Sequence, residues 1–420
     1  MHLRCGACGA THPADRLVIR CHCGGLLDVV IDRNGPIDRA IFDRRLTALV
    51  GAERSGVWRY RELLPPLPDT AIVTKPEGNT NLYEVPGLAA WAGVSRLVLK
   101  HEGENPTGSF KDRGMTVATS HALWVGASVV ACASTGNTSA SVAAYAAAAG
   151  LPAIVFLPVG KISAAKLGQA IAYGARIVQI RGDFDAAMAL VQEAARRFGI
   201  YLLNSINPFR LEGQKTIVVE LLHQLGWEVP DWIILPGGNL GNTAAVGKAL
   251  AELHEVGLIG RMPRVAVVQA EGAAPFYAAY RTGFKEYRPV HPETVATAIR
   301  IGDPVSYAKA RRTIEVTGGV VAAVSDAAIL EAKARIDRAG IGCEPASAAT
   351  LAGLRALVAE GVIPVGASVA GILTGHLMKD TDAVMAYHLG PDAETHPLAN
   401  PPRVIDPTPA ALEELLSEVL

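Results

Sequence analysis

Short hydrophobic blocks alternate with longer amphipathic segments through most of the chain. The apolar blocks at 97–100 and 154–157 have the length of buried strands. The segments at 115–125 and 140–149 instead place their apolar residues at the spacing of helices. Strands and helices that alternate at this spacing predict parallel sheets joined by crossover helices, which is the α/β class.

The same pattern predicts further elements on both sides of these four. Strands are expected at 128–133, 176–180, 201–203, 232–235, 265–269 and 367–373. Helices are expected at 42–50, 163–173, 183–198, 213–225, 243–256, 326–339, 346–359 and 409–420. The region between 269 and 326 shows a looser pattern, and we predict no regular element within it.

Charged residues are few and unevenly placed. Half of the 420 residues are hydrophobic and only 19% are charged, against about 25% in an average soluble domain. Residues 114–160 contain no Asp, Glu, Lys or Arg, but polar and breaking residues interrupt every apolar run, so we expect buried helices and strands and no membrane span. The net charge of −1 gives no electrostatic reason to bind nucleic acid or an anionic membrane.

The cysteines fall into isolated residues, Cys132 and Cys343, and two close pairs, Cys5 with Cys8 and Cys21 with Cys23. The N-terminus lacks the features of an export signal, so we expect a reducing cytoplasm, no disulfides, and isolated cysteines that lie reduced in the core. The pairs resemble half-sites for zinc, with His12 or His22 as substitute ligands. A metal-free ribbon held by packing and a set of free thiols are the alternatives.

Lys111 lies between a predicted strand and a predicted helix, at the edge of the charge-free segment. Desolvation there would lower the pKa of its amine and make it a usable nucleophile or base. The alternative is a surface lysine whose charge pairs with Asp112. Glu102 and Glu104 also lie nearby, and we expect them to make surface or hinge contacts.

Three more segments place polar groups at the ends of predicted strands. Residues 134–139 and 236–243 each join a strand end to a helix start, where hydroxyls and backbone N–H groups suit an anion. The second segment is glycine-rich and can approach a phosphate closely, although it lacks the dinucleotide and P-loop fingerprints. Thr374 adds a hydroxyl after the last strand. The alternatives are ordinary capping by Thr138 or Ser139, and a glycine-rich turn without a ligand.

A lysine, a phosphate cup and polar strand ends on one α/β sheet are what pyridoxal phosphate requires. The segments that resemble threonine synthases are 104–114, 134–138, 204–208, 210–216 and 373–379. The resemblance covers nearly the whole chain and departs from the family at Leu377, where a glycine is expected. It implies a tryptophan-synthase-β-like, fold-type II architecture of two domains with a small cysteine-rich ribbon at the N-terminus.

The resemblance also implies domain limits and site residues. The expected parts are a ribbon at 1–35, a large cofactor-binding domain at 36–101 and 200–395, a small mobile domain at 102–199 and a tail with a helix at 396–420. Lys111 would bond to the cofactor, Asn137 would contact its ring hydroxyl oxygen, and Thr374 would contact its pyridine nitrogen. The cofactor phosphate would be held by Gly238, Asn239, Leu240, Gly241 and Asn242. The substrate phosphate would be held by Ser134, Thr138, Ser205, Arg210 and Asn239.

The activity that the resemblance implies is that of a pyridoxal-phosphate-dependent lyase. Such an enzyme converts O-phospho-L-homoserine and water to L-threonine and phosphate by β,γ-elimination and water addition, the last step of threonine biosynthesis. A cytoplasmic homodimer with a small-molecule substrate, and without a nucleic-acid or membrane partner, is the expected form. The nearest alternative is a β-replacement enzyme acting on phosphoserine, similar to cysteate synthase. A zinc-ribbon nucleic-acid-binding protein with an inactive enzyme-like body is a different class, and the near-neutral charge argues against it.

Overall fold

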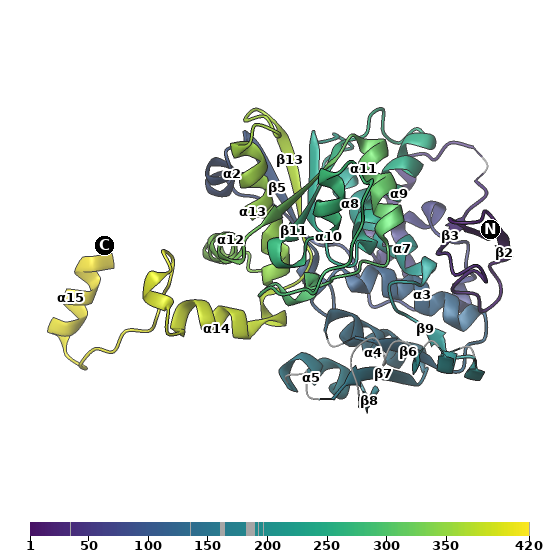
Figure 1. The fold of residues 1–420 in the computed structure, drawn as a ribbon, viewed down its shortest axis with the longest axis horizontal. Helices are drawn as coiled ribbons and strands as arrows, with labels where there is room; N and C mark the ends of the chain where they lie inside the picture. The colour runs from purple at the N-terminus through teal and green to yellow at the C-terminus, as the bar shows by residue number, and fades with distance from the viewer. Residues whose placement is uncertain are drawn as a thin grey trace. The chain divides into compact units, whose positions relative to one another are not determined.

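The computed structural model (Figure 1) describes residues 1–33, 35–134, 136–159, 164–181, 190–191, 193–195 and 197–419. Met1–Asp380 forms one compact unit and Thr381–Leu420 forms a second. None of the helices that the structure describes is long and apolar enough to cross a bilayer.

The first unit contains a six-stranded sheet with the order β12-β11-β10-β13-β5-β4. Its strands are β4 (Leu82–Glu84), β5 (Arg96–His101), β10 (Trp232–Pro236), β11 (Arg264–Ala270), β12 (Val320–Val324) and β13 (Ser368–Leu373). All neighbours in this sheet are parallel except β4 and β5. Parallel strands need crossover connections, and helices therefore cover both faces of the sheet.

Strand β10 is apolar at every position because both of its faces are buried. Ile234 faces a hydrophobic cluster with α12 (Asp326–Arg338) and α13 (Pro345–Ala359). Its neighbour Ile233 faces the opposite cluster, which includes α8 (Thr216–Gln224) and α9 (Gly241–Glu255). Both faces are buried, so the period-2 alternation of a half-exposed strand is absent.

A second sheet has four parallel strands in the order β8-β7-β6-β9. Its strands are β6 (Val130–Ala133), β7 (Ala153–Pro158), β8 (Arg176–Ile180) and β9 (Tyr201–Leu202), and the helices nearby are α3 (Lys111–Trp124), α4 (Asn137–Ala149) and α5 (Ala164–Ala172). The charge-free segment supplies most of α3, then β6, α4 and β7, as the pattern predicted. The limits of a small and a large domain stay a prediction.

The N-terminal ribbon is a three-stranded antiparallel sheet of β1 (His2–Cys5), β2 (Thr11–Pro13) and β3 (Leu27–Val30). Leu3 and Leu27 are fully buried and join the hydrophobic cluster that also contains Met115 of α3. The ribbon is thus part of the first unit's core.

The α/β prediction is confirmed, and three of the elements that the sequence did not predict lie between 269 and 326. Helices α10 (Pro275–Arg281) and α11 (Tyr307–Thr317) and strand β12 lie in the region predicted to be irregular. The helix predicted at 42–50 is shorter, since α1 spans Ala40–Arg44 and a 3-10 turn follows it. The helix predicted at 183–198 lies largely outside the described residues.

The second unit contains helices α14 (Thr381–Leu389) and α15 (Pro409–Val419). His396 stacks on Tyr387 with ring centroids 4.3 Å apart, and its Nδ1 lies 2.7 Å from the carbonyl oxygen of that tyrosine. The helix predicted at 409–420 is α15.

Candidate active site

Lys111 is the first residue of α3 and lies close to the end of β13. The N–H of Phe110 donates to the carbonyl of Thr374 at 3.0 Å, and Ser109 forms a β-bridge with Gly375. Among the described residues, Nζ of Lys111 makes no hydrogen bond or ion pair, and it lies 4.2 Å from the centroid of the Phe110 ring. Its amine is therefore available for chemistry.

The surroundings of Lys111 favour the neutral amine. Desolvation by the surrounding protein lowers the pKa of Lys111 to about 7, and the positive charge of Arg210 adds to this effect, while Glu344 opposes it. Asp112 is fully buried and does not pair with the lysine, since its carboxylate accepts hydrogen bonds from the N–H and hydroxyl of Thr107 at 2.6 and 2.7 Å. The alternative of a surface ion pair between Lys111 and Asp112 is therefore wrong.

Arg210 reaches this site because α7 (Pro208–Gln214) packs directly on α3. A Cβ atom at Gly213 would lie 1.7 Å from the carbonyl oxygen of Arg113, so only glycine allows this approach. A Cβ atom at Gly114 would likewise lie 2.7 Å from the carbonyl oxygen of Arg210. The two glycines bring the arginine helix against the lysine helix.

The guanidinium of Arg210 is buried without a counter-charge. Arg210 is 1% exposed, and its Nη1 donates to the carbonyl of Leu203 at 3.1 Å. Nε has no partner, and no ion pair to Arg210 occurs within the described part of the chain. Burial lowers the pKa of Arg210 to about 10. Burying a charge costs free energy unless the charge is paired. The planar guanidinium of Arg210 can donate two parallel hydrogen bonds to the oxygens of a phosphate.

Glu344 is a carboxylate of this site that the sequence analysis missed. Its two oxygens accept hydrogen bonds from Nδ2 of Asn137 at 3.1 and 3.0 Å, and its backbone N–H donates to the carbonyl of Gly375 at 3.0 Å. Burial raises the pKa of Glu344, against opposing effects of Asn137 and nearby lysines. An acidic residue before a helix-starting proline is an ordinary capping pattern, so nothing in the sequence singled it out.

The glycine-rich loop joins β10 to α9. Leu240 has a left-handed backbone, with φ of 61°, and turns the chain into the helix. Asn239 donates from Nδ2 to the hydroxyl of Ser205 at 3.1 Å and accepts from the N–H of Val305 at 2.8 Å. Two residues predicted to hold the substrate phosphate, Asn239 and Ser205, are thus in direct contact.

Asn242 is the residue of this loop whose surroundings best fit a ligand. The residue is 6% exposed, and both its amide oxygen and its amide nitrogen are buried without a partner. The hydroxyls of Thr243 and Ser306 are buried and unpaired as well. Buried polar groups are nearly always hydrogen-bonded, so this cluster fits a polar group such as the phosphate of a cofactor.

Among the described residues, no side chain caps the start of α4. The capping position is Gly136, and the hydroxyl of Ser139 donates to its carbonyl at 2.7 Å and caps no N–H. The alternative in which Thr138 or Ser139 caps the helix is therefore wrong. Ser134, which precedes this turn, accepts a hydrogen bond from the N–H of Gly136 at 3.3 Å. No described side chain accepts from the N–H groups of Asn137 and Thr138, so these groups can donate to a ligand.

Thr374 follows β13 and is 4% exposed. Its hydroxyl lies 2.9 Å from the hydroxyl of Ser347, which also accepts the N–H groups of Thr374 and Gly375 at 2.8 and 2.9 Å. A serine oxygen that accepts two N–H groups has its hydrogen left to donate to Thr374. The hydrogen of the Thr374 hydroxyl is then free to donate to a ligand.

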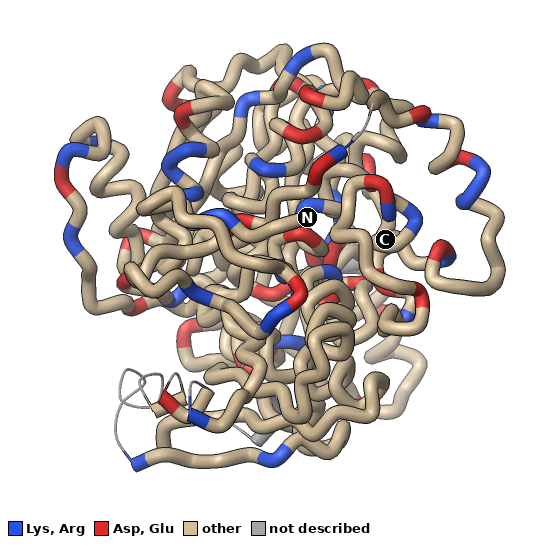
Figure 2. Tube along the Cα trace, turned by 90° about the vertical axis from the view of Figure 1, so that its right-hand side faces the viewer, with Lys and Arg blue, Asp and Glu red and all other residues tan. Residues whose placement is uncertain are grey.

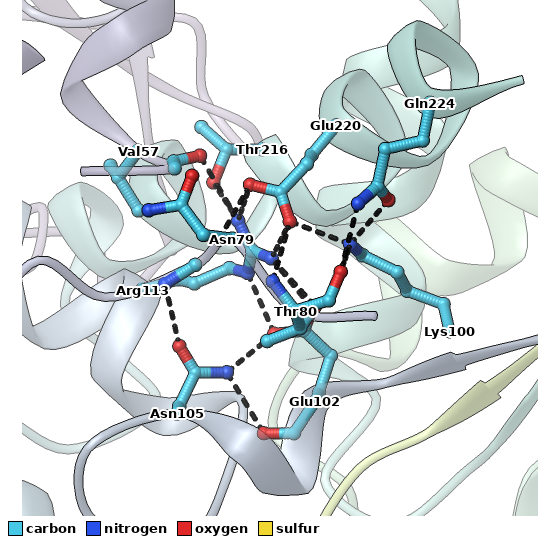
Figure 3. Close-up of polar contacts among 12 residues, drawn as sticks. Val57, Asn79, Thr80, Lys100, Glu102, Asn105, Arg113, Thr216, Glu220 and Gln224 are labelled. Carbon is cyan, nitrogen blue, oxygen red and sulfur yellow. Dashed lines mark hydrogen bonds and ion pairs between the residues drawn. The ribbon is translucent and has the colours of Figure 1, made fainter. Parts of the chain in front are cut away.

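A buried network of charges lies beside Lys111, and Figure 3 shows its members: Lys100 of β5, Glu102, Arg113 of α3 and Glu220 of α8. We call these four residues the charge network, and their side chains are at most 1% exposed. Arg113 donates to Glu102 at 2.6 Å and to Glu220 at 2.8 Å. Glu102 is therefore buried, which contradicts a surface contact, while the alternative of a hinge contact stays a prediction. The network ties the start of α3 to β5 and α8.

Comparison with known proteins agrees with this site. Residues 73–375 match the model of the pyridoxal-phosphate dependent enzyme family. The chain is 47% identical to threonine synthase of Methanocaldococcus jannaschii over 384 residues, which is 91% of this chain and 94% of the relative. It is 48% identical to threonine synthase of Methanosarcina acetivorans over 388 residues, covering 91% and 93%.

Solved structures show the same fold at lower identity. The crystal structure of threonine synthase from Escherichia coli is 20% identical, with a TM-score of 0.71 and full coverage of both chains. Maize serine racemase is 21% identical, with a TM-score of 0.65 over 82% of this chain and 100% of that one. The chain therefore belongs to the pyridoxal-phosphate dependent enzymes of fold-type II and, within them, to the threonine synthase family.

Proposed function

We propose that this chain converts O-phospho-L-homoserine and water to L-threonine and phosphate. The observation that carries the proposal is the buried guanidinium of Arg210, which has no carboxylate partner among the described residues and lies near the unpaired amine of Lys111. An amine beside an uncompensated cation suits an amino acid that carries a phosphate ester. The identities of 47% and 48% to two threonine synthases support this reaction.

The polar groups of the site fit pyridoxal phosphate. Lys111 would hold its aldehyde carbon, and the loop of Gly238, Asn239, Leu240, Gly241 and Asn242 would hold its phosphate. Asn137 would donate to the ring oxygen, and the free hydroxyl hydrogen of Thr374 would donate to the ring nitrogen. When bound, the cofactor supplies an acceptor for the electrons released at Cα of the substrate. A hydroxyl donor, rather than a carboxylate, leaves that ring nitrogen unprotonated.

Lys111 would move the protons of the reaction. A pKa of about 7 leaves a large fraction of its amine neutral at physiological pH, so it can accept a proton from Cα and return protons at neighbouring carbons. Loss of phosphate from Cγ and addition of water at Cβ then give threonine. Glu344, held by Asn137, keeps a carboxyl beside this amine.

Arg210 would bind the substrate phosphate together with the side chains of Ser134, Thr138, Ser205 and Asn239. The contact between Asn239 and Ser205 at 3.1 Å already joins two of these groups. Removal of water from such a site strengthens its charge interactions and protects the reacting carbons. We expect residues 102–199 to act as a mobile small domain that closes over the substrate.

Product analysis tests the proposal against its nearest alternative. The purified enzyme should release threonine and phosphate from O-phospho-L-homoserine and should not form cysteate from phosphoserine and sulfite. Release of cysteate without threonine would overturn the proposal and favour the β-replacement enzyme. Both substrates carry a phosphate that Arg210 could bind. The assay therefore tests which length of carbon chain between Cα and the phosphate the site accepts.

The assembly and location of the chain are proposed on the resemblance to the family. We expect a homodimer in the cytoplasm, with a small-molecule substrate as its ligand. Sedimentation of the purified protein should give twice the mass of the 44.0 kDa chain. A monomer at working concentration would contradict the dimer.

A further inference from the structure

The ribbon brings four cysteines together outside the candidate active site. Cys5 ends β1 and Cys8 lies in the turn after it, while Cys21 and Cys23 lie in the turn before β3. The Sγ atoms of Cys5 and Cys23 are 3.5 Å apart, and those of Cys8 and Cys21 are 3.7 Å apart. All four Sγ atoms lie within 4.8 Å of one another, and no disulfide joins them.

The two shortest of these distances match the edges of a tetrahedron around one zinc ion, and the others are no longer than 4.8 Å. Zinc binds thiolate sulfur at about 2.3 Å, which places four sulfurs about 3.8 Å apart. We propose that Cys5, Cys8, Cys21 and Cys23 form a structural zinc site of the closed, four-thiolate type. Such a site has no open position for substrate, so its role is to stabilise the ribbon.

The backbone around the cysteines is shaped for this cluster. The N–H of Gly9 donates to the carbonyl of Cys5 at 3.0 Å, and the N–H of Gly24 donates to the carbonyl of Cys21 at 2.9 Å, so each pair lies on a tight turn. A Cβ atom at Gly25 would lie 2.6 Å from Sγ of Cys5, so a side chain there would displace the sulfur.

The N–H of Gly25, and Nε2 of His12 in the tautomer that carries its hydrogen there, can donate to thiolate sulfurs. The N–H of Gly25 points at Sγ of Cys23 at 3.4 Å, and Nε2 of His12 lies 3.3 Å from Sγ of Cys21. Four thiolates around a divalent ion leave two negative charges, which N–H donors offset. We therefore assign His12 as a positioning residue: it contacts the sulfur of Cys21 and does not itself bind the zinc ion.

A second donor set competes for the same sulfur. His12, Cys21 and His22 also lie close enough to hold an ion. This set supplies three ligands and would need a fourth from outside, whereas the four cysteines complete a tetrahedron by themselves. The proposed zinc site is therefore the four-cysteine set, and the experiment must exclude binding by His12, Cys21 and His22.

The zinc site would stabilise contacts that reach the catalytic helices. Strand β3 follows the second cysteine turn directly, and Lys309 of α11 donates to the carbonyl of Leu27 at 2.7 Å. Lys248 of α9 donates to the carbonyl of Val29 at 2.6 Å. His121 of α3 contacts the carbonyl of Ala14 at 2.7 Å. Loss of zinc should thus destabilise the ribbon and loosen its attachment to α3, α9 and α11.

Metal analysis of the full-length protein tests the site without using its activity. The purified chain should contain about one zinc ion per chain, and Cys8→Ser and Cys23→Ser should each lower this content at least about tenfold. His12→Ala and His22→Ala should keep it. Zinc that is absent from the unaltered chain, or that depends on His12 and His22 but survives both cysteine substitutions, would overturn the proposal.

Thiol titration covers the case in which a cysteine variant fails to fold. In the unaltered chain, removal of metal by a chelator should make the exposed Cys8 and Cys23 reactive. Loosening of the ribbon should then add Cys5 and Cys21, while Cys132 and Cys343 stay buried in the core. Equal reactivity with and without chelator would contradict the site. The visible colour of the bound cofactor should survive chelation, which separates a failure of this proposal from a failure of the proposed function.

Discussion

Two buried regions meet at the start of α3, and they handle charge in opposite ways. In the charge network, Lys100 donates at 2.5–2.6 Å to a carbonyl, a glutamate and a glutamine, so every charge has partners. The charge-free segment, residues 114–160, avoids the cost of burial by carrying no Asp, Glu, Lys or Arg. Figure 1 places β6, α4 and β7 in the lower part of the view, and the same level in Figure 2 is mostly tan, with a few coloured residues along its lower edge.

The difference between the regions explains why the pKa of Lys111 is low. Burial lowers the pKa of Lys100 as well, but Glu220 opposes that effect at hydrogen-bond distance. Lys111 has no such partner among the described residues, and its pKa falls to about 7. Paired charges hold the fold together, whereas the unpaired Lys111 and Arg210 are available for ligands.

Loss of the unpaired amine should have the largest effect. Lys111→Ala should lower kcat by about 10⁴-fold, since it removes both the cofactor attachment and the acid–base group. The thermal stability of its cofactor-free form should change little, because the side chain makes no hydrogen bond or ion pair among the described residues, whereas the cofactor-bound enzyme should lose the stabilisation that the cofactor gives. Steady-state kinetics and thermal melting measure both quantities, with the exposed Lys285 changed to alanine as the control. Activity close to the unaltered level would contradict the assignment.

A break in the charge network should affect stability instead. Glu220→Gln leaves the charges of Lys100 and Arg113 with one partner fewer, so the free energy of unfolding should fall by about 3–5 kcal/mol. Denaturant titration measures the change, and Glu255→Gln at an exposed site of α9 is the matched control. If both variants unfold at the same denaturant concentration, the network does not stabilise the fold.

Arg210→Lys tests the shape of the unpaired cation while keeping its charge. A lysine cannot present the planar fork, so binding of the substrate phosphate should lose about 1.5–3 kcal/mol, a decrease in kcat/KM of about 10- to 100-fold. The loss should appear mainly in KM. Arg338→Lys, at an exposed position, should have no effect. An unchanged KM in the Arg210→Lys variant would show that Arg210 does not bind the substrate phosphate.

The smallest effect concerns the titration of Lys111 in the cofactor-free chain. Since its pKa is lowered, the amine is protonated below about pH 7 and neutral above it, so acylation of Lys111 should rise with pH through about 7. Glu344→Gln removes a negative charge that raises this pKa, so the midpoint should move lower. Peptide mass spectrometry measures the modified fraction. A midpoint near the ordinary lysine value of 10.5 would contradict the unpaired amine.

The sequence predicted the fold well where its patterns were regular. The alternation of strands and helices around β5, α3, β6 and α4 was correct because each element buries a continuous apolar surface. The region that holds α11 and β12 was predicted as irregular. Helix α11 buries Ala310, Thr313, Ile314 and Thr317 at helical spacing. Two of these four residues are threonines, so its buried face is hard to recognise in the sequence.

The site was predicted in part, and the misses share a cause. Lys111 and Arg210 lie in motifs that the family resemblance makes visible. Glu344 and Glu102 were missed or misplaced, since a glutamate in a turn has the same local pattern whether it faces water or a buried cation. Only the three-dimensional contacts with Asn137 and Arg113 separate the two cases.

The most direct test of the account is the identity of the residue that carries the cofactor. Borohydride reduction of the coloured protein attaches the cofactor permanently to its amine, and peptide mass spectrometry locates it. The account predicts the label on Lys111, and loss of the absorbance near about 410–420 nm in Lys111→Ala. A label on Lys100 or Lys379, or an unchanged spectrum in that variant, would contradict it.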